Sequence, residues 1–167
     1  TKEDSFYLPL HTSSLNYVAT TNDLIFTNEA SDTVDITDYS NYRTNIETSV
    51  AEVTTESYTE SYTLGTKYFI VSQIIGRYQK NTKTDSLYFY VSKNRGGPDL
   101  KTSSLVGQIY PQQEFDGVFL DSVNLNNTWY FNVYHAYYAQ DSLGFFVKED
   151  NGLVGIEDNG QYINLLN

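Results

Sequence analysis

The chain has 167 residues and no cysteine, and its 21 acidic against 10 basic residues give a formal charge of -11. That charge has the wrong sign for binding nucleic acid or an anionic membrane surface. The missing cysteines exclude disulfides, thiolate nucleophiles and cysteine-ligated zinc. A chain of this length buries roughly 70% of its unfolded surface on folding, so it needs no cross-link. It starts at Thr1 and contains no methionine, from which we expect a mature or trimmed, exported form.

The composition favours β-structure from the first residues onward. The sequence contains 16 Tyr and 9 Phe against a single Trp, and aromatic and β-branched residues suit a pleated, half-buried surface. Pro9 makes residues 6–10 an edge strand or a packed extended arm. Short strands are predicted at 15–19 and 24–27, and residues 33–37 alternate between apolar and polar, which is a strand signal.

The segment that follows is less regular. In residues 39–53 the apolar side chains of Ile46, Val50 and Val53 have helical spacing, but the flanking Thr and Ser are poor helix formers. A short helix is therefore kept as a less favoured alternative. Residues 54–64 place hydroxyl groups on one face and carboxylates between tyrosines on the other. This pattern predicts a strand with much solvent contact.

Three further strands are predicted in the middle of the chain. Residues 67–78 are nearly continuously apolar, which predicts a strand covered on both faces, and Gly76 predicts a bulge in it. In residues 86–93 the apolar side chains of Leu87, Phe89 and Val91 are expected to point inward, opposite Tyr88 and Tyr90. A loop at 94–99 precedes the next strand, at 105–110.

The last third of the chain predicts a β-meander. Its strands are predicted at 118–125, 128–139, 144–148, 153–156 and 161–166. The turns between them are expected at 126–127 and at two copies of Glu-Asp-Asn-Gly, 149–152 and 157–160. Asn and Gly tolerate the positive φ that tight hairpin turns need.

These elements predict one all-β antiparallel domain over residues 1–167. About ten strands with regular turn signals and no crossover helix are typical of a barrel or a sandwich. We expect a long meander curled into a lipocalin-like barrel or half-barrel, with a two-sheet β-sandwich as the alternative.

Few residues suggest catalysis or metal binding. The Glu-Asp-Asn-Gly turns bring four carboxylates together and could hold Ca²⁺, but hairpins favour the same residues for backbone reasons alone, so we expect no metal and no cofactor. His11 and His135 are too few for a three-histidine site. His135 shares its strand face with large apolar groups, which predicts a partly buried histidine; its alternative role is a general base.

The most aromatic strand is the candidate binding site. Tyr130, Tyr134 and Tyr138 are predicted to share one face, opposite Trp129, Phe131, Val133, His135 and Tyr137. Such stripes bind sugars, peptides or apolar ligands, or simply cover a sheet. The candidate ligand-binding residues are Trp129, Tyr130, Tyr134, His135, Tyr138, Tyr88 and Tyr90.

Several short phrases near the end of the chain recur in a known family. They are Phe145-Phe146-Val147-Lys148, Gly152-Leu153-Val154-Gly155-Ile156, Asn159-Gly160 and Leu165, together with Asn132-Val133-Tyr134, Leu24-x-Phe26-x-Asn28 and Asp32-Thr33-Val34. They resemble the closing hairpins of uncharacterised exported lipoproteins of Bacteroidetes-type bacteria, although Tyr162 or Ile163 stands where that family has Trp. The resemblance implies a lipid-anchored surface or periplasmic β-protein, anchored through a cysteine upstream of Thr1. It implies no catalytic residues.

Two functions follow as hypotheses. The first is a non-enzymatic binding or structural module of the cell envelope, whose partner is a small molecule, a glycan or a protein, and which contacts membrane only through the upstream anchor. The second is a glycan-directed hydrolase, which requires two carboxylates within ~10 Å in a cleft. Glu56 and Glu60 do not qualify as this pair, because four residues of one strand separate them by about 13 Å.

Overall fold

The computed structural model describes residues 6–8, 14, 24–48, 53–65, 69–79, 84–93, 101–149 and 151–166. Nearly all of these residues lie in strands, which form two seven-stranded sheets. None of the described segments is a helix long and apolar enough to cross a membrane. The all-β prediction is therefore confirmed for the described part of the chain.

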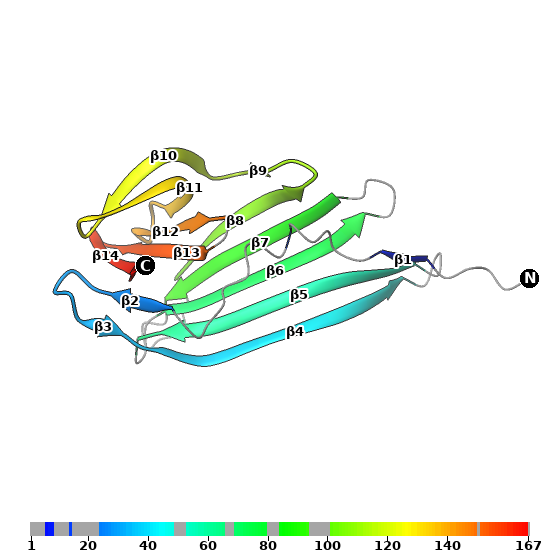
Figure 1. Cartoon of the computed structure of the whole chain (residues 1–167), viewed down its shortest axis with the longest axis horizontal. Helices are drawn as coiled ribbons and strands as arrows, with labels where there is room; N and C mark the ends of the chain where they lie inside the picture. Colours follow the sequence, from blue (N-terminus) through cyan, green and yellow to red (C-terminus); the bar gives the residue numbers. More distant parts are fainter. Residues whose placement is uncertain are drawn as a thin grey trace, which may run out of the picture.

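Five strands of sheet A have ten or more residues, and Figure 1 shows them running side by side. Its members are β1 (Phe6–Leu8), β4 (Ile36–Thr48), β5 (Val53–Leu64), β6 (Phe69–Gln79), β7 (Thr84–Lys93), β8 (Lys101–Tyr110) and β9 (Glu114–Phe115). Strands β4 to β9 follow one another in chain order, each antiparallel to the next. β1 runs parallel to β5 and meets it over Val53–Thr55.

Sheet B joins the two ends of the chain. Its order is β10 (Val118–Leu125), β11 (Thr128–Tyr138), β12 (Leu143–Lys148), β13 (Gly152–Asp158), β14 (Gln161–Leu166), β2 (Ile25–Thr27) and β3 (Thr33–Val34). All neighbours in it are antiparallel. The pairing of Phe26 with Leu165 places the early strand β2 beside the last one.

The chain passes from one sheet to the other at two corners. Only Asp35 separates β3 from β4, and only Asp116 and Gly117 separate β9 from β10. Gly117 is required at its corner, because a Cβ there would collide with the Leu105 side chain and approach the His135 carbonyl oxygen to 2.8 Å. The two sheets are thus connected along both sides, and the segments described here do not close into a single barrel. The two-sheet sandwich predicted as the alternative fits this arrangement.

The core lies between the sheets. Leu87, Phe89 and Val91 of β7 are buried, whereas Tyr88 is exposed, so the predicted alternation of this strand is confirmed. Phe89 stacks on Phe145 of β12, with 5.3 Å between ring centroids. This contact fixes which face of β12 looks toward sheet A.

Sheet B also buries its other face. Phe146 follows Phe145 in β12 and therefore points away from sheet A, yet it is only 3% exposed. Its ring stacks on His135 of β11 at 4.3 Å, with 5° between the planes. Nearby, a Cβ on Gly155 of β13 would lie 2.5 Å from Leu125 of β10. Sheet B thus curls over its own hairpin β10–β11, which explains why β12 and β13 are buried along most of their length.

Several local predictions can be compared with the structure. The strands expected at 24–27, 54–64, 67–78, 86–93 and 105–110, and those of the closing meander, are present. The predicted bulge is confirmed, since the register of β6 against β7 shifts between Gly76 and Gln79. Of residues 33–37, the first two form β3 and the last two begin β4, with Asp35 between the strands. The strand expected at 15–19 and the loop at 94–99 lie outside the described residues.

Two predictions are wrong. The helical alternative at 39–53 fails over its described part because Ile36–Thr48 forms β4, whose pairing with β5 over Ser40–Thr48 outweighs a weak helical spacing; residues 49–52 lie outside the described ranges. The expected solvent contact of 54–64 also fails, because Tyr58, Glu60 and Tyr62 of β5 are buried at 7%, 2% and 4% exposure. Burial, with Glu60 as a further cause, raises the pKa of Tyr58, whose hydroxyl donates a hydrogen bond of 3.4 Å to the Glu60 carboxylate.

Candidate functional site

The candidate site lies on the hairpin β10–β11, whose turn is fixed by two asparagines. Asn126 and Asn127 have φ of 49° and 66°, the left-handed values that a two-residue turn requires. The Asn126 side-chain amide donates hydrogen bonds of 2.9 Å to the carbonyl oxygen of Tyr162 and to the Asn164 side chain. The predicted turn therefore also ties the hairpin to β14.

Tyr130 is a structural residue of this hairpin. It is 3% exposed, and its hydroxyl donates a short hydrogen bond to the Leu165 carbonyl oxygen and accepts one of 3.0 Å from Asn164. Burial raises the pKa of the Tyr130 phenol. The prediction that Tyr130 binds a ligand loses its basis, since the side chain is enclosed by the protein itself.

The residues on either side of Tyr130 point outward. Trp129 and Phe131 are 59% and 57% exposed, although both are large and apolar. Across the hairpin they pair with Asn124 and Ser122, which are exposed as well. Large aromatic rings therefore stand beside small polar groups on the outer face of this hairpin.

The strand changes its alternation at Asn132. This residue has a φ of 55° and is exposed, and the next buried residue after Tyr130 is Val133, three positions on. The predicted common face of Tyr130, Tyr134 and Tyr138 is therefore wrong, because the left-handed residue shifts the inward positions by one. Tyr134 is half-buried and does not share the enclosed position of Tyr130.

Tyr134 forms an aromatic cluster at the end of the hairpin nearest sheet A. Its ring meets Phe115 of β9 edge-on at 4.5 Å and Phe119 of β10 at 5.3 Å, and Phe119 is 49% exposed. Burial, with the Glu149 carboxylate as a further cause, raises the pKa of Tyr134. We call Trp129, Phe131, Phe119 and Tyr134 together the aromatic ribbon.

His135 lies on the concave face of sheet B. Its Nε2 atom is 3.3 Å from the Glu157 carboxylate but makes no well-directed hydrogen bond, and 22% of its side chain is exposed. Burial lowers the pKa of the imidazole, and the charge of Glu157 opposes this shift. A Cβ on Gly144 would lie 3.1 Å from Nε2, so the glycine makes room for the ring. The histidine is thus partly buried, as its strand pattern predicts.

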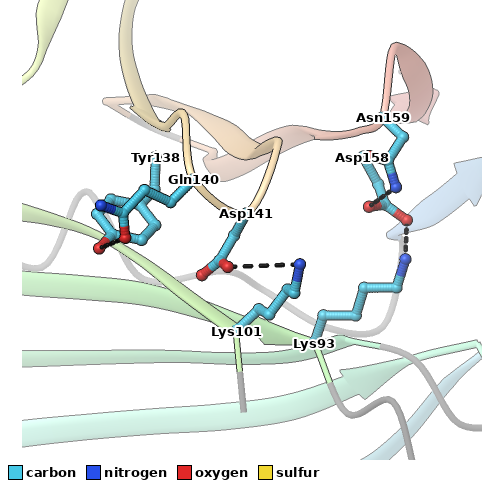
Figure 2. Close-up of polar contacts among 7 residues, drawn as sticks. All are labelled: Lys93, Lys101, Tyr138, Gln140, Asp141, Asp158 and Asn159. Carbon is cyan, nitrogen blue, oxygen red and sulfur yellow. Dashed lines mark hydrogen bonds and ion pairs between the residues drawn. The ribbon is translucent and has the colours of Figure 1, made fainter. Parts of the chain in front are cut away.

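The remaining candidates lie elsewhere. Tyr138 is 43% exposed and donates a hydrogen bond of 2.8 Å to the Gln140 side chain (Figure 2). Tyr88 is exposed and Tyr90 half-buried on the outer face of sheet A, with 5.3 Å between their rings. The structure therefore does not bring the predicted residues into one site. Phe131 and Phe119 complete the ribbon and were absent from the candidates. Sequence alone shows neither the change of alternation at Asn132, which brings Phe131 to the side of Tyr134, nor the pairing that places Phe119 opposite Tyr134.

Two hollows lie away from the ribbon. A cleft of about 530 Å³ and an adjoining one of about 280 Å³ are formed around the turn between β2 and β3. None of the predicted binding residues lines either of them. Sequence reasoning missed these clefts because their walls come from segments far apart in the chain.

The structure also clarifies the Glu-Asp-Asn-Gly turns. Gly152, Asn159 and Gly160 have φ of 70°, 50° and 80°, so the turns use these residues for their backbone conformation. Within the described ranges, no three His, Asp or Glu side chains gather in a way that could hold a metal ion. Asp150 lies outside those ranges.

The chain matches no protein-family model, no curated protein and no solved structure. The candidate site is therefore defined by its own geometry. It is a group of exposed and half-buried aromatic rings on the hairpin β10–β11, flanked by small polar side chains; Trp129 and Phe131 lie where β11 pairs with β10, and pairing with β12 begins at Val133.

Proposed function

We propose that this protein is a non-enzymatic binding module of the cell envelope that holds a glycan on the aromatic ribbon. The observation that carries the proposal is the exposure of Trp129 and Phe131, each by more than half, on the part of β11 that is paired with β10. Trp129 and Phe131 lie two residues apart on one side of the strand, and exposed hydrophobic patches commonly mark binding sites. The strand holds both rings in place before any ligand arrives, which lowers the entropic cost of binding.

The shape of the ribbon favours a glycan over a small apolar ligand. Small apolar molecules bind in concave pockets that enclose most of their surface, whereas these rings stand on an open outer face. A sugar can lay its C–H face on a ring and keep its hydroxyls hydrogen-bonded. Ser122, Asn124 and Asn132 are exposed beside the rings and offer such bonds. The formal charge of -11 disfavours sulfated or phosphorylated glycans, so the proposed ligand is a neutral glycan.

The envelope location rests on different support. The closing hairpins resemble those of exported lipoproteins. The chain also lacks cysteine, which fits an exported β-protein that folds without disulfides. The proposal is tested by expressing the natural precursor with a radiolabelled fatty acid and fractionating the cells. Label in a membrane-bound form supports the anchor, and a label-free protein in the cytoplasmic fraction would refute it.

The test of the ribbon is retention on neutral polysaccharides. Trp129→Ala and Phe131→Ala each remove one exposed ring without opening the core. We expect each to weaken binding at least tenfold, or about 1.4 kcal/mol, in affinity electrophoresis against a panel of neutral polysaccharides. Tyr42→Ala is the matched control, because Tyr42 is 54% exposed on β4, in the other sheet. Equal retention of all three variants and the parent protein would contradict the proposal.

The hydrolase alternative finds less support. Glu29 and Asp158 line the same cleft, but Asp158 forms an ion pair with Lys93. A glycosidase needs two carboxyl groups that are both available to the glycosidic bond, and the Asp158 carboxylate is already engaged by Lys93. A search for released sugar with the same polysaccharide panel tests this alternative directly.

A further inference from the structure

The larger cleft has the size and position of a ligand site. Its volume of about 530 Å³ lies within the ~300–1,000 Å³ range of small-molecule sites. It is bordered by β6 and β7 of sheet A, by β13 and β14 of sheet B, and by the turn between β2 and β3. The smaller cleft shares Asn28, Phe69 and Ile163 with it, so the two hollows adjoin.

The turn that forms one wall is rigidly built. The Asn28 side-chain oxygen accepts hydrogen bonds from the backbone amides of Ala30 and Asp32, at 3.0 and 2.9 Å. The backbone of Asn28 also bonds to Asp32 and Ser31. Glu29 accepts a hydrogen bond of 3.3 Å from the Tyr162 amide on β14. The wall is therefore in place without a ligand.

The floor of the cleft is apolar. Phe69 and Ile156 are 5% and 1% exposed and belong to the core, and Ile163 packs against that core. The Lys93 ammonium group lies 5.8 Å from the centre of the Phe69 ring, while it is paired with Asp158. The apolar body of a small ligand would bury its surface against these side chains.

The charge around the cleft is negative. Glu29 and Asp158 line the larger hollow and Asp35 the smaller one, and Lys93 is the one basic residue among the described lining residues of both. Because Lys93 is paired with Asp158, the charges of Glu29 and Asp35 are left to act on a ligand. The pKa of Tyr162 is raised, first by burial and then by the nearby carboxylates of Glu157 and Glu29.

We infer that this cleft is a second binding site, independent of the glycan ribbon, and that it takes a small organic cation with an apolar body. The body would lie on Phe69, Ile156 and Ile163, and the ammonium group would face Glu29 at the rim. An anion would meet the same carboxylates and be repelled. An uncharged molecule of the same shape would gain the apolar contact alone.

Three probes with one body test this inference: phenethylamine, 2-phenylethanol and phenylacetate. Each is titrated into the ¹⁵N-labelled protein while the backbone amide signals of Glu29, Ala30, Gln161 and Tyr162 are followed. We expect the amine to shift these signals with at least tenfold higher affinity than the alcohol, and the carboxylate to shift none. Equal affinity of the amine and the alcohol, or no shift with any probe at millimolar concentration, would overturn the inference.

Two variants, Glu29→Gln and Ala30→Phe, test whether the probes bind in the larger cleft. Glu29→Gln keeps the acceptor for the Tyr162 amide but removes the charge, so we expect it to lower amine affinity about tenfold, or ~1.4 kcal/mol, and to leave alcohol affinity unchanged. Glu114→Gln is the matched control, because Glu114 is an exposed carboxylate on β9 that lines neither cleft. Ala30→Phe fills the mouth and should abolish binding of both probes. Unchanged amine binding by Glu29→Gln would refute the site, and polysaccharide retention by the same variant reports separately on the ribbon.

Discussion

At the scale of single residues, His135 makes stability depend on pH. Burial holds its imidazole neutral in the folded protein and lowers its pKa below the ordinary value. Near pH 6.5 the imidazole of the unfolded chain therefore binds a proton, whereas the imidazole of the folded protein binds it only at a lower pH. The contribution of the neutral His135 to the free energy of unfolding is complete above about pH 6.5 and is lost as the pH falls toward the folded-state pKa.

Replacing the histidine should remove this dependence. His135→Phe retains a flat ring to stack on Phe146 but cannot bind a proton. We expect the loss of unfolding free energy between pH 7.5 and pH 5 to be smaller in this variant than in the parent protein, as measured by urea denaturation. Glu157→Gln serves as the comparison: it removes the charge that opposes the shift, so its loss should be larger. Identical pH slopes in all three proteins would contradict the assignment.

The buried hydroxyl of Tyr130 is expected to contribute to the free energy of unfolding. Its bonds to Leu165 and Asn164 join β11 to β14 across the concave face. Tyr130→Phe should reduce the free energy of unfolding by about 1–3 kcal/mol, because the carbonyl and amide that remain are buried without their partner. Tyr138→Phe, whose hydroxyl bonds to exposed Gln140, should cost less than ~0.5 kcal/mol. Equal losses in the two variants would show that the buried bonds do not matter.

At the scale of elements, two lysines join sheet A to the turns of sheet B. Lys93 and Lys101 lie opposite each other on β7 and β8, where like charges repel. Figure 2 shows each of them directed to an aspartate of sheet B, Lys93 to Asp158 and Lys101 to Asp141, the latter pair at 3.4 Å. The aspartates therefore both attract the lysines and screen them from one another.

This arrangement predicts coupling between the two pairs. Asp141→Asn and Asp158→Asn should each lower the free energy of unfolding by about 1 kcal/mol at low salt. The double variant should lose more than the sum, because it leaves the two lysines facing each other without a counter-charge. Denaturation at low and high salt measures both effects, and the excess should shrink at high salt. A strictly additive double variant would show that the two pairs act separately.

Much of sheet B could be predicted from sequence because its signals are local. Asn126-Asn127 and Asn159-Gly160 define their turns through positive φ, whatever the rest of the chain does. The burial of Glu60 and the inward position of Tyr130 could not be predicted, because each depends on which sheet covers that face. Of the aromatic ribbon, Trp129 and Tyr134 were among the predicted residues. Phe131 was missed because the change of alternation at Asn132 has no sequence signal, and Phe119 because its position opposite Tyr134 depends on the pairing of β10 with β11. The clefts left no local signal, since β6, β7, β13 and β14 meet only in the folded protein.

At the scale of the whole molecule, the two sheets differ in what they bury. Sheet A covers the core with one face and exposes Tyr88 on the other, whereas sheet B buries a second face against its own hairpin. Among the strands that the structure describes, none covers Trp129 and Phe131 on the outer face of that hairpin. The exposure of Trp129 and Phe131 is thus a result of the curl, and the proposed binding surface and the second buried face are two sides of the same hairpin.

The pairing of β2 with β14 sets the order in which the molecule can be completed. The hairpins of sheet A are formed by strands adjacent in sequence, so their loops are short and can close early in folding. β2 makes the pairing that is most distant in sequence, because Phe26 pairs with Leu165. Until that pairing forms, the edge of β2 and the concave face of sheet B remain without their partners, so the contact between β2 and β14 is the step that completes sheet B.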